Sequence, residues 1–229
     1  MTNAPPKGQK AMSTIIIRNL SDQLVDLVRD RILAGQVPVD QAIRQDALAS
    51  ELGVSKIPLR EALTRLEQEG LIRSQANRGF FVRPLTGDEA EEVYELRLKL
   101  EPEVVGAAAA RANDEDRAFA TQQLKALDAH APGDGDTVGA LNRAFHLALI
   151  RPAGQPITTQ LLERLHVLSD RYVRKHLEPL GRDQRASEEH AEILRLWLAR
   201  DSKAVAKSMH AHIKKTITDL RRQLGTNGG

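Results

Sequence analysis

The stretch LASELGVSKIPLREALTRLEQEGLI, residues 48–72, decides how the first part of this chain folds. Ser55 is a good N-cap, and Pro58 follows in the first helical turn, where a missing N–H costs little. Apolar residues then recur at helical spacing until Gly70, which is suited to end the helix. A shorter helical pattern over 44–51 comes just before, separated by a tight turn. The stretch therefore predicts a helix-turn-helix.

The flanking sequence completes a small domain around this motif. Upstream, apolar residues at helical spacing predict a helix over 20–33 with Ser21 as its N-cap. Downstream, two short strand-like runs flank Asn-Arg-Gly at 77–79, which predicts a β-hairpin. A helix-turn-helix followed by a hairpin is a winged helix-turn-helix, which we place at 17–84. Residues 1–16 carry Lys and Pro without an apolar run, and we expect them to form a disordered arm.

The remainder of the chain shows helical patterns and no convincing strand. Gly, Pro and Asp clusters separate most of these patterns, and short connections favour antiparallel packing of neighbouring helices. We therefore expect a mainly α protein, whose second domain is an all-α antiparallel helical bundle over 88–225. The helices are expected at 88–111, 115–129, 136–150, 155–176, 185–200 and 202–224.

The composition fits a two-domain protein whose first domain is mildly basic. The chain has 229 residues, and its first 84 hold 12 Lys and Arg against 9 Asp and Glu, whereas the rest holds 21 against 22. The absence of cysteine excludes disulfides and zinc-thiolate sites. There is neither a secretory h-region nor an apolar run long enough for a membrane helix, so we expect a cytoplasmic protein.

The residue types at the start of the third helix suit DNA contacts. A recognition helix presents small polar and basic side chains at its N-terminal end, and Ser55, Lys56 and Arg60 meet this requirement. Lys56 and Arg60 are four residues apart and so share a helix face. Arg44 precedes the first helix of the motif and is a candidate for a phosphate contact. The alternative is that these side chains form only a solvated helix face.

The motif resembles a known family. LGVSKIPLREALTRLEQEGLI followed by NRGFFV resembles the winged helix-turn-helix of GntR regulators, and YELRLKLEPEVVGAAAARA resembles the opening helix of the FCD domain of the FadR-like subfamily. The resemblance implies DNA contacts by Ser55, Lys56, Arg60 and the wing. Lys56 stands where the family most often has Arg, and Gln45 where many members have Glu. The DNA-binding set is thus Arg44, Ser55, Lys56, Arg60, Asn77, Arg78 and Gly79.

Histidines in the second domain suggest a metal site. Ala199 lies nine positions after His190, and His212 lies nine positions after Lys203, so an antiparallel hairpin places the two histidines at the same height. His146 lies on another helix of the bundle, and ligands from facing helices commonly build metal sites. The alternative is that these are satisfied core residues. The same alternative is favoured for His130, His166, His176 and His210.

The FCD resemblance sharpens this expectation. FCD domains are known for a site of one Asp and three His, with the Asp four residues before the first His. NRAFH at 142–146 matches this pattern except that Asn142 replaces the Asp, which leaves a neutral and weaker donor. Three nitrogens and one oxygen suit zinc best, while nickel or manganese is compatible. The predicted metal ligands are His146, His190, His212 and Asn142.

Basic residues in the second domain suggest an anionic effector. A buried Arg97 needs an anion, and a ligand carboxylate would supply it, as the FCD resemblance also implies. The alternative is a salt bridge from Arg97 to Glu101 on the same helix. Arg143 is a second candidate, and Arg171 a weaker one. Trp197 is expected to be a core anchor rather than a ligand-stacking residue.

These features favour a homodimeric transcriptional regulator that binds double-stranded operator DNA and senses a small carboxylate. We expect it to be a repressor rather than an activator. The alternative is a metal-dependent enzyme built on the three histidines. That enzyme would need a general base, and Glu189 diverges by about 100° from its neighbour His190 on a helix. An architectural DNA-binding protein is a third possibility, which would leave the second domain without a role.

Overall fold

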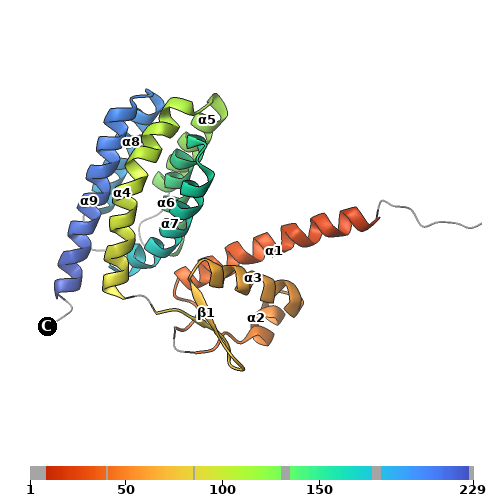
Figure 1. Cartoon of the computed structure of the whole chain (residues 1–229). Coiled ribbons are helices and arrows are strands. Elements are labelled where there is room, and N and C mark those ends of the chain that lie inside the picture. The colour runs from red at the N-terminus through yellow and green to blue at the C-terminus, as the bar shows by residue number, and fades with distance from the viewer. Residues whose placement is uncertain (1–8, 40, 85, 130–134, 177–181, 227–229) are drawn as a thin grey trace, which may run out of the picture. The chain divides into compact units, whose positions relative to one another are not determined.

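The computed structural model describes residues 9–39, 41–84, 86–129, 135–176 and 182–226. The chain divides into two compact units, residues 1–84 and 85–229. Within the described residues, the first unit contains three helices and a two-stranded hairpin, and the second is a helical bundle (Figure 1). This confirms the mainly α fold class, with a winged helix-turn-helix followed by an all-α bundle. Among the described residues, no helix is both long enough and apolar enough to cross a membrane.

The first unit is built on three helices, α1 (Gln9–Leu33), α2 (Gln45–Glu51) and α3 (Lys56–Gln68). Ser55 is the N-cap of α3, as predicted, with extended backbone at φ −78° and ψ 161°. Arg29 on α1 donates two hydrogen bonds, of 2.8 and 2.7 Å, to Glu69 just after α3. Apolar side chains of both helices form the core; they include Leu24, Val28, Ile32, Leu59, Leu63 and Leu66.

The wing is an antiparallel hairpin of β1 (Ile72–Gln75) and β2 (Gly79–Val82). Its register pairs Ile72 with Val82 and Gln75 with Gly79, so residues 76–78 form the connection. Asn77 and Gly79 both have positive φ, at 60° and 89°, a conformation that Asn and Gly adopt most readily. The predicted turn is therefore present, and it presents an exposed tip from a buried base.

Helix α1 begins earlier than the sequence pattern predicts. Residues 9–16, expected in a disordered arm, are helical here, and residues 1–8 of that arm lie outside the described residues. Ser21 is not an N-cap but lies within α1, buried, with its hydroxyl 3.4 Å from the Glu61 carboxylate to which it donates. The physical reason is that no Gly or Pro interrupts the chain between Gln9 and Leu33.

In the part of the second unit that the structure describes, six α-helices form an antiparallel arrangement. Two of them begin at capping boxes, Thr86 with Glu89 and Asn113 with Asp116, which satisfy amides at the helix N-termini. A short 3-10 helix, η1 (Arg151–Ala153), follows the third helix. The helices are α4 (Gly87–Arg111), α5 (Asp114–Asp128), α6 (Gly135–Ile150), α7 (Pro156–His176), α8 (Arg182–Leu198) and α9 (Ser202–Thr226).

The bundle core is mainly apolar but also contains several buried polar residues. Trp197 is a core anchor, as expected: it is 1% exposed, and its indole donates to the Leu149 carbonyl over 3.2 Å. Buried polar residues are unusual in a core unless they are paired or functional. Among the residues whose burial the structure describes, those of this bundle are Arg97, Glu101, His146, His166, Ser169, Asp170, His190 and Asp219.

Helices α4 and α9 lie side by side (Figure 1), and Gly106 allows their close approach. A Cβ atom at this position would lie 2.8 Å from the backbone oxygen of Ser202, which is too close for an ordinary contact. At an open helical site, Gly→Ala stabilises by up to about 1 kcal/mol. Here we expect Gly106→Ala to lower the free energy of unfolding by about 1–3 kcal/mol, because the helices must separate.

Urea denaturation checks this prediction. Ala110→Gly, at an exposed position of the same helix, is the matched control and reports the helix-propensity effect alone. A Gly106→Ala variant more stable than the wild type would contradict the tight contact between α4 and α9.

Candidate functional site

The N-terminal end of α3 presents the predicted DNA-reading residues to solvent. Ser55, Lys56 and Arg60 are exposed, and the Ser55 hydroxyl makes no capping hydrogen bond that would occupy it. Lys56 forms an exposed ion pair with Asp46 of α2. Ile57, which lies between Lys56 and Arg60 in the sequence, is 73% exposed. Such exposure is unusual for a large apolar side chain unless it contacts a partner. This end of α3 therefore offers hydroxyl, basic and apolar groups together.

The arginines of the first unit fall into two groups. Arg29 and Arg65 serve the fold, since Arg29 binds Glu69 and Arg65 donates to Asp22 of α1 over 2.5 Å. Arg60, by contrast, has no side-chain partner among the described residues, although its carbonyl accepts from the Thr64 hydroxyl. A solvated cation on the exposed face of α3 can bind DNA without first breaking an internal contact.

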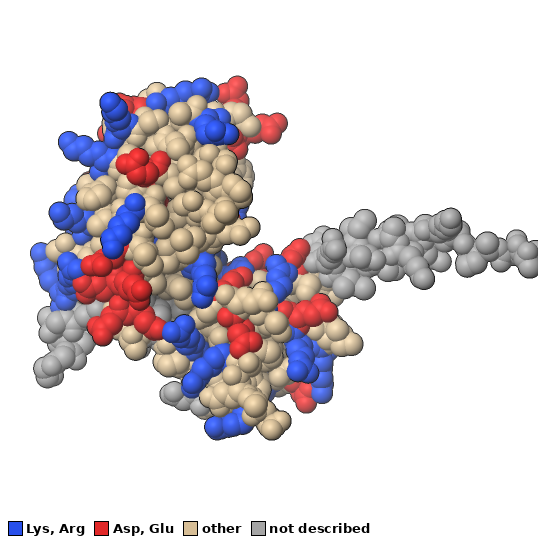
Figure 2. All heavy atoms as spheres, viewed as in Figure 1, with Lys and Arg blue, Asp and Glu red and all other residues tan. Residues whose placement is uncertain are grey.

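The wing and the start of α2 hold the other predicted residues. Arg78 is exposed at the hairpin tip, and its guanidinium lies over the Phe81 ring, 5.6 Å from the centroid. Asn77 is also exposed, and Arg44 is exposed as the N-cap residue of α2. On the face seen in Figure 2, basic and acidic side chains are interspersed rather than gathered into one basic patch. Nucleic-acid binding at this face would therefore depend on positioned contacts more than on a concentrated basic charge.

The three predicted histidines come together in the bundle. His146 on α6, His190 on α8 and His212 on α9 each offer a ring nitrogen, and these atoms lie within 4.8 Å of one another. Their ring centroids are 4.8 to 5.4 Å apart. His146 and His190 are buried, and burial lowers the pKa of His146 to about 3, so its imidazole is neutral. Imidazoles that converge from three helices are a donor set that suits a transition-metal ion.

The chemistry of these residues fits a metal ion. The buried Nε2 of His190 makes no hydrogen bond within the described part of the chain, and an unsatisfied buried nitrogen is costly without a ligand. Asn142, the fourth predicted ligand, lies one turn before His146 on α6 and is half-buried. His146, His190 and His212, with Asn142 as the predicted fourth ligand, are the residues that would hold the ion.

Two carboxylates accept hydrogen bonds from the Nδ1 atoms of His146 and His212. Glu101 on α4, 0% exposed, accepts from Nδ1 of His146 over 2.9 Å. Glu189 on α8 accepts from Nδ1 of His212 over 2.7 Å and from Lys215 over 2.7 Å. Burial alone raises the pKa of Glu189, but the hydrogen bonds from His212 and Lys215 outweigh burial and lower it to about 2. Both groups are therefore carboxylates that hold the imidazoles.

Sequence reasoning missed part of this arrangement. His166, expected to be an ordinary core histidine, lies within 4.8 Å of ligand atoms of Glu101 and His146, in a second group that could hold a metal. Its Nε2 is 3.2 Å from the Glu101 carboxylate, yet neither ring nitrogen makes a directed hydrogen bond. Glu189 does diverge from His190, but that divergence lets it reach His212. Only the packing of separate helices brings these residues together, so no local signal identifies them.

The two candidate effector arginines are both paired. Arg97 donates to Glu101 over 2.8 Å, and this contact is the intrahelical salt bridge that the sequence left as an alternative. Arg97 also donates to Ser169 of α7 over 3.0 Å. Burial opposes the charge of Arg97, but Glu101 offsets this and raises the Arg97 pKa. Arg143 forms an ion pair with the buried Asp170 of α7. Each guanidinium would have to change partners to bind an effector.

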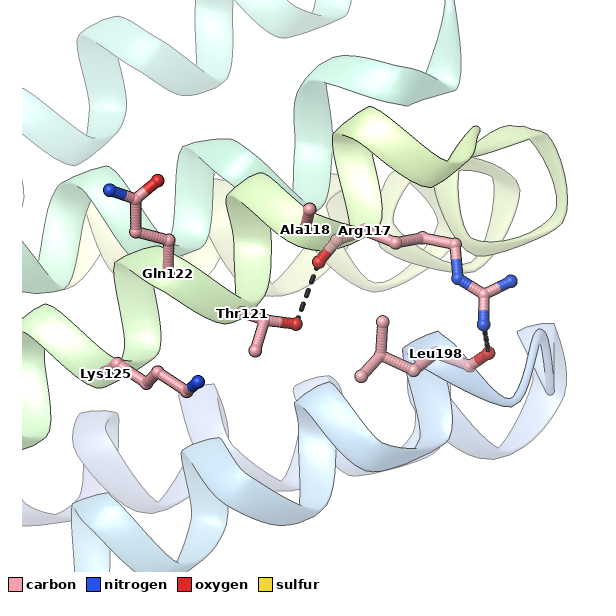
Figure 3. A pocket seen from close by; sticks show the side chains of 6 residues that line it. All are labelled: Arg117, Ala118, Thr121, Gln122, Lys125 and Leu198. Carbon is pink, nitrogen blue, oxygen red and sulfur yellow. Dashed lines mark hydrogen bonds between the residues drawn. The ribbon is translucent and has the colours of Figure 1, made fainter.

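A pocket between α5 and α8 offers less specific chemistry (Figure 3). Arg117 donates to the Leu198 carbonyl over 2.8 Å, and the Thr121 hydroxyl donates to the Arg117 carbonyl over 2.8 Å. The remaining lining groups are Ala118, Gln122 and Lys125. With no histidine or carboxylate in this lining, the histidine cluster is the stronger candidate for a functional site in the bundle.

An exposed recognition helix with a wing, joined in one chain to a helical bundle that buries a histidine cluster, defines a two-domain DNA-binding regulator. Residues 20–82 match the family of bacterial regulatory proteins called the gntR family, and residues 92–215 match the FCD domain. The chain therefore belongs to the GntR family of transcriptional regulators, with an FCD domain as its helical unit.

Individual relatives agree. The chain is 32% identical over 180 residues to the Nta operon transcriptional regulator of Aminobacter aminovorans, covering 79% of this chain and 84% of that protein. It is 26% identical over 210 residues to the repressor GlaR of Escherichia coli, covering 87% and 95%. The structure of E. coli McbR/YncC shares the fold, with TM-score 0.76 at 24% identity over 89% of this chain and 98% of that one. The first two relatives are named as transcriptional regulators, and the third shows the fold.

Proposed function

We propose that this regulator is a homodimeric repressor that releases operator DNA when a small carboxylate binds beside a metal ion in its FCD domain. The observation that carries the proposal is the convergence of His146, His190 and His212 from three helices. A neutral His146 and an unsatisfied His190 nitrogen support it. Zinc suits three nitrogens and the Asn142 oxygen best, and nickel or manganese is compatible with the same donors.

The DNA-binding part of the proposal assigns contacts to exposed residues. Ser55, Lys56 and Arg60 contact base edges and phosphates in the major groove, and Arg44 contacts a phosphate. Asn77, Arg78 and Gly79 of the wing approach the neighbouring groove. Two such units in a homodimer read a pseudo-palindrome. The similarity to GlaR, which is named a repressor, supports repression as the sign of regulation.

The sensing part of the proposal places the effector at the metal. When bound, the ion supplies a Lewis-acidic position that attracts an anionic oxygen. Arg97 and Arg143 lie nearby as cations paired to Glu101 and Asp170. A carboxylate effector would compete with these internal carboxylates for the guanidinium groups. Such an exchange would alter the contacts of α4 with α7, and regulation requires a difference of this kind between the free and bound states.

Capture of random genomic fragments by the purified protein tests the proposal. At near-physiological salt, we expect enrichment of a short pseudo-palindrome, and its neighbouring genes would nominate the carboxylate to assay for release. Recovery of a single, non-repeated half-site would contradict the homodimer. Binding that disappears with modest salt and shows no motif would contradict sequence-specific regulation.

A further inference from the structure

Two of the three clustered histidines are held by carboxylates at the same ring atom. Nδ1 of His146 lies 2.9 Å from Oε1 of Glu101, and Nδ1 of His212 lies 2.7 Å from Oε2 of Glu189. A carboxylate can only accept a hydrogen bond, so each Nδ1 carries the proton and donates it. In a neutral imidazole the lone pair is then on Nε2, which is the atom left to bind a metal.

The third histidine is consistent with the same use of Nε2. Nε2 of His190 is buried and makes no hydrogen bond among the described residues. Its ring lies 4.8 Å from the ring of His212 and 5.3 Å from that of His146, measured between centroids. Three Nε2 atoms are thus assigned to one centre, two of them by a carboxylate on the opposite side of the ring.

The direct ligands of this centre carry no formal charge. Imidazole is neutral when it binds a metal, and Asn142, one turn before His146 on α6, offers only an amide. A divalent ion in a buried site of neutral donors lacks the anionic partner that buried charges require. Among the described residues, the carboxylates that contact these histidines are Glu101 and Glu189.

We propose that Glu101 and Glu189 are positioning residues that supply the negative charge of the metal centre through His146 and His212, in place of an acidic ligand at position 142. This inference rests on the proposed metal site. A carboxylate behind a ligating histidine fixes the tautomer and raises the basicity of the ligand, and its loss commonly weakens metal binding by about 10–100-fold. The anionic groups of the centre thus contact the histidine ligands and do not bind the ion directly.

Each carboxylate also accepts a hydrogen bond from a cationic side chain. Arg97, four residues earlier on α4, donates to Glu101 over 2.8 Å, and both side chains are buried. Lys215, on α9 with His212, donates to Glu189 over 2.7 Å. These cations hold the carboxylates in place, and without the carboxylates they would stand unopposed near a bound metal ion. Neutralising either glutamate should therefore weaken metal binding more than loss of a hydrogen bond alone.

Conservative amide variants separate charge from shape. Glu101→Gln and Glu189→Gln keep an acceptor oxygen for Nδ1 but remove the charge. Glu103→Gln on α4 and Glu188→Gln on α8 are matched controls, since both glutamates are exposed. The measurement is zinc affinity of the full chain by competition with a chromophoric chelator, together with the absorption spectrum of the cobalt(II)-loaded protein. We expect each test variant to bind about 10–100-fold more weakly, and each control to match the wild type.

Rescue by Asn142→Asp distinguishes charge supply from packing. An aspartate at this position returns a negative charge one helical turn from His146. We expect Asn142→Asp to restore most of the lost zinc affinity in the Glu189→Gln background, and to increase affinity more there than in the wild type. A merely structural glutamate would give no such coupling, and the altered cobalt spectrum would not return toward that of the wild type.

The outcomes are separable. If Glu101→Gln fails to fold because Arg97 is left unpaired, the Glu189→Gln variant decides, since Glu189 is only partly buried and its partner Lys215 is exposed. Unchanged zinc affinity in Glu189→Gln overturns the inference and leaves the metal site intact. A loss that Asn142→Asp does not rescue also overturns it. A wild-type chain that takes up no zinc, nickel or manganese instead refutes the metal centre of the proposed function, and the inference with it.

Discussion

Arg60→Ala is expected to lower the affinity for the captured operator fragment by roughly ten-fold or more, since a charge-assisted base or phosphate contact is worth ~1–3 kcal/mol. Arg60 is exposed on α3, and no side-chain partner holds it in the described part of the chain. Its removal should therefore leave the stability of the winged-helix unit nearly unchanged. Fluorescence anisotropy with labelled operator, at one fixed salt concentration, measures the difference.

Arg65 provides the matched control on the same helix. Its guanidinium donates to Asp22 over 2.5 Å, so the structure gives it a role in joining α3 to α1. Arg65→Ala should thus have a smaller effect on operator affinity than Arg60→Ala, and any effect should come with a change in the melting temperature. Equal operator binding by Arg60→Ala and the wild type would remove Arg60 from the DNA-binding surface.

Local signals account for what could be predicted of the winged-helix unit. Ser55 as N-cap, Gly70 after α3 and the Asn-Arg-Gly turn at 77–79 each require only a few neighbouring residues to be recognised. The start of α1 could not be predicted in this way. Ser21 has the chemistry of an N-cap, but it is buried within the helix and donates to Glu61, a contact of the tertiary structure.

The histidine cluster shows the same division between local and distant information. Equal spacing from the turn between α8 and α9 was enough to align His190 with His212, because an antiparallel hairpin fixes the register. Glu101 and His166 could not be assigned to the site, since they belong to α4 and α7, whose relative rotation the sequence does not specify. Arg97 shows the limit of pattern reasoning: burial predicted an anion but could not choose between Glu101 and an effector.

Replacing both His190 and His212 with alanine is expected to abolish stoichiometric metal binding. The double variant keeps only His146 of the three nitrogen donors, and a single imidazole beside an amide does not form a stable zinc site. Metal content after purification and dialysis, determined by inductively coupled plasma mass spectrometry, measures the result. His210→Ala is the matched control, because His210 is exposed on α9, two residues before His212.

The same variants distinguish a bound metal from surface adsorption. An ion that binds only the folded state stabilises that state by RT ln(1 + [L]/Kd), or about 2.7 kcal/mol when the free ion is at 100 times its Kd. Chelation should therefore lower the melting temperature of the wild type and of His210→Ala, and should leave that of the double variant unchanged. Because removal of the buried His190 itself destabilises the bundle, the decisive quantity is the shift on chelation within each variant. An equal metal content and an equal chelation shift in all three proteins would place the metal elsewhere and leave the three histidines as core residues.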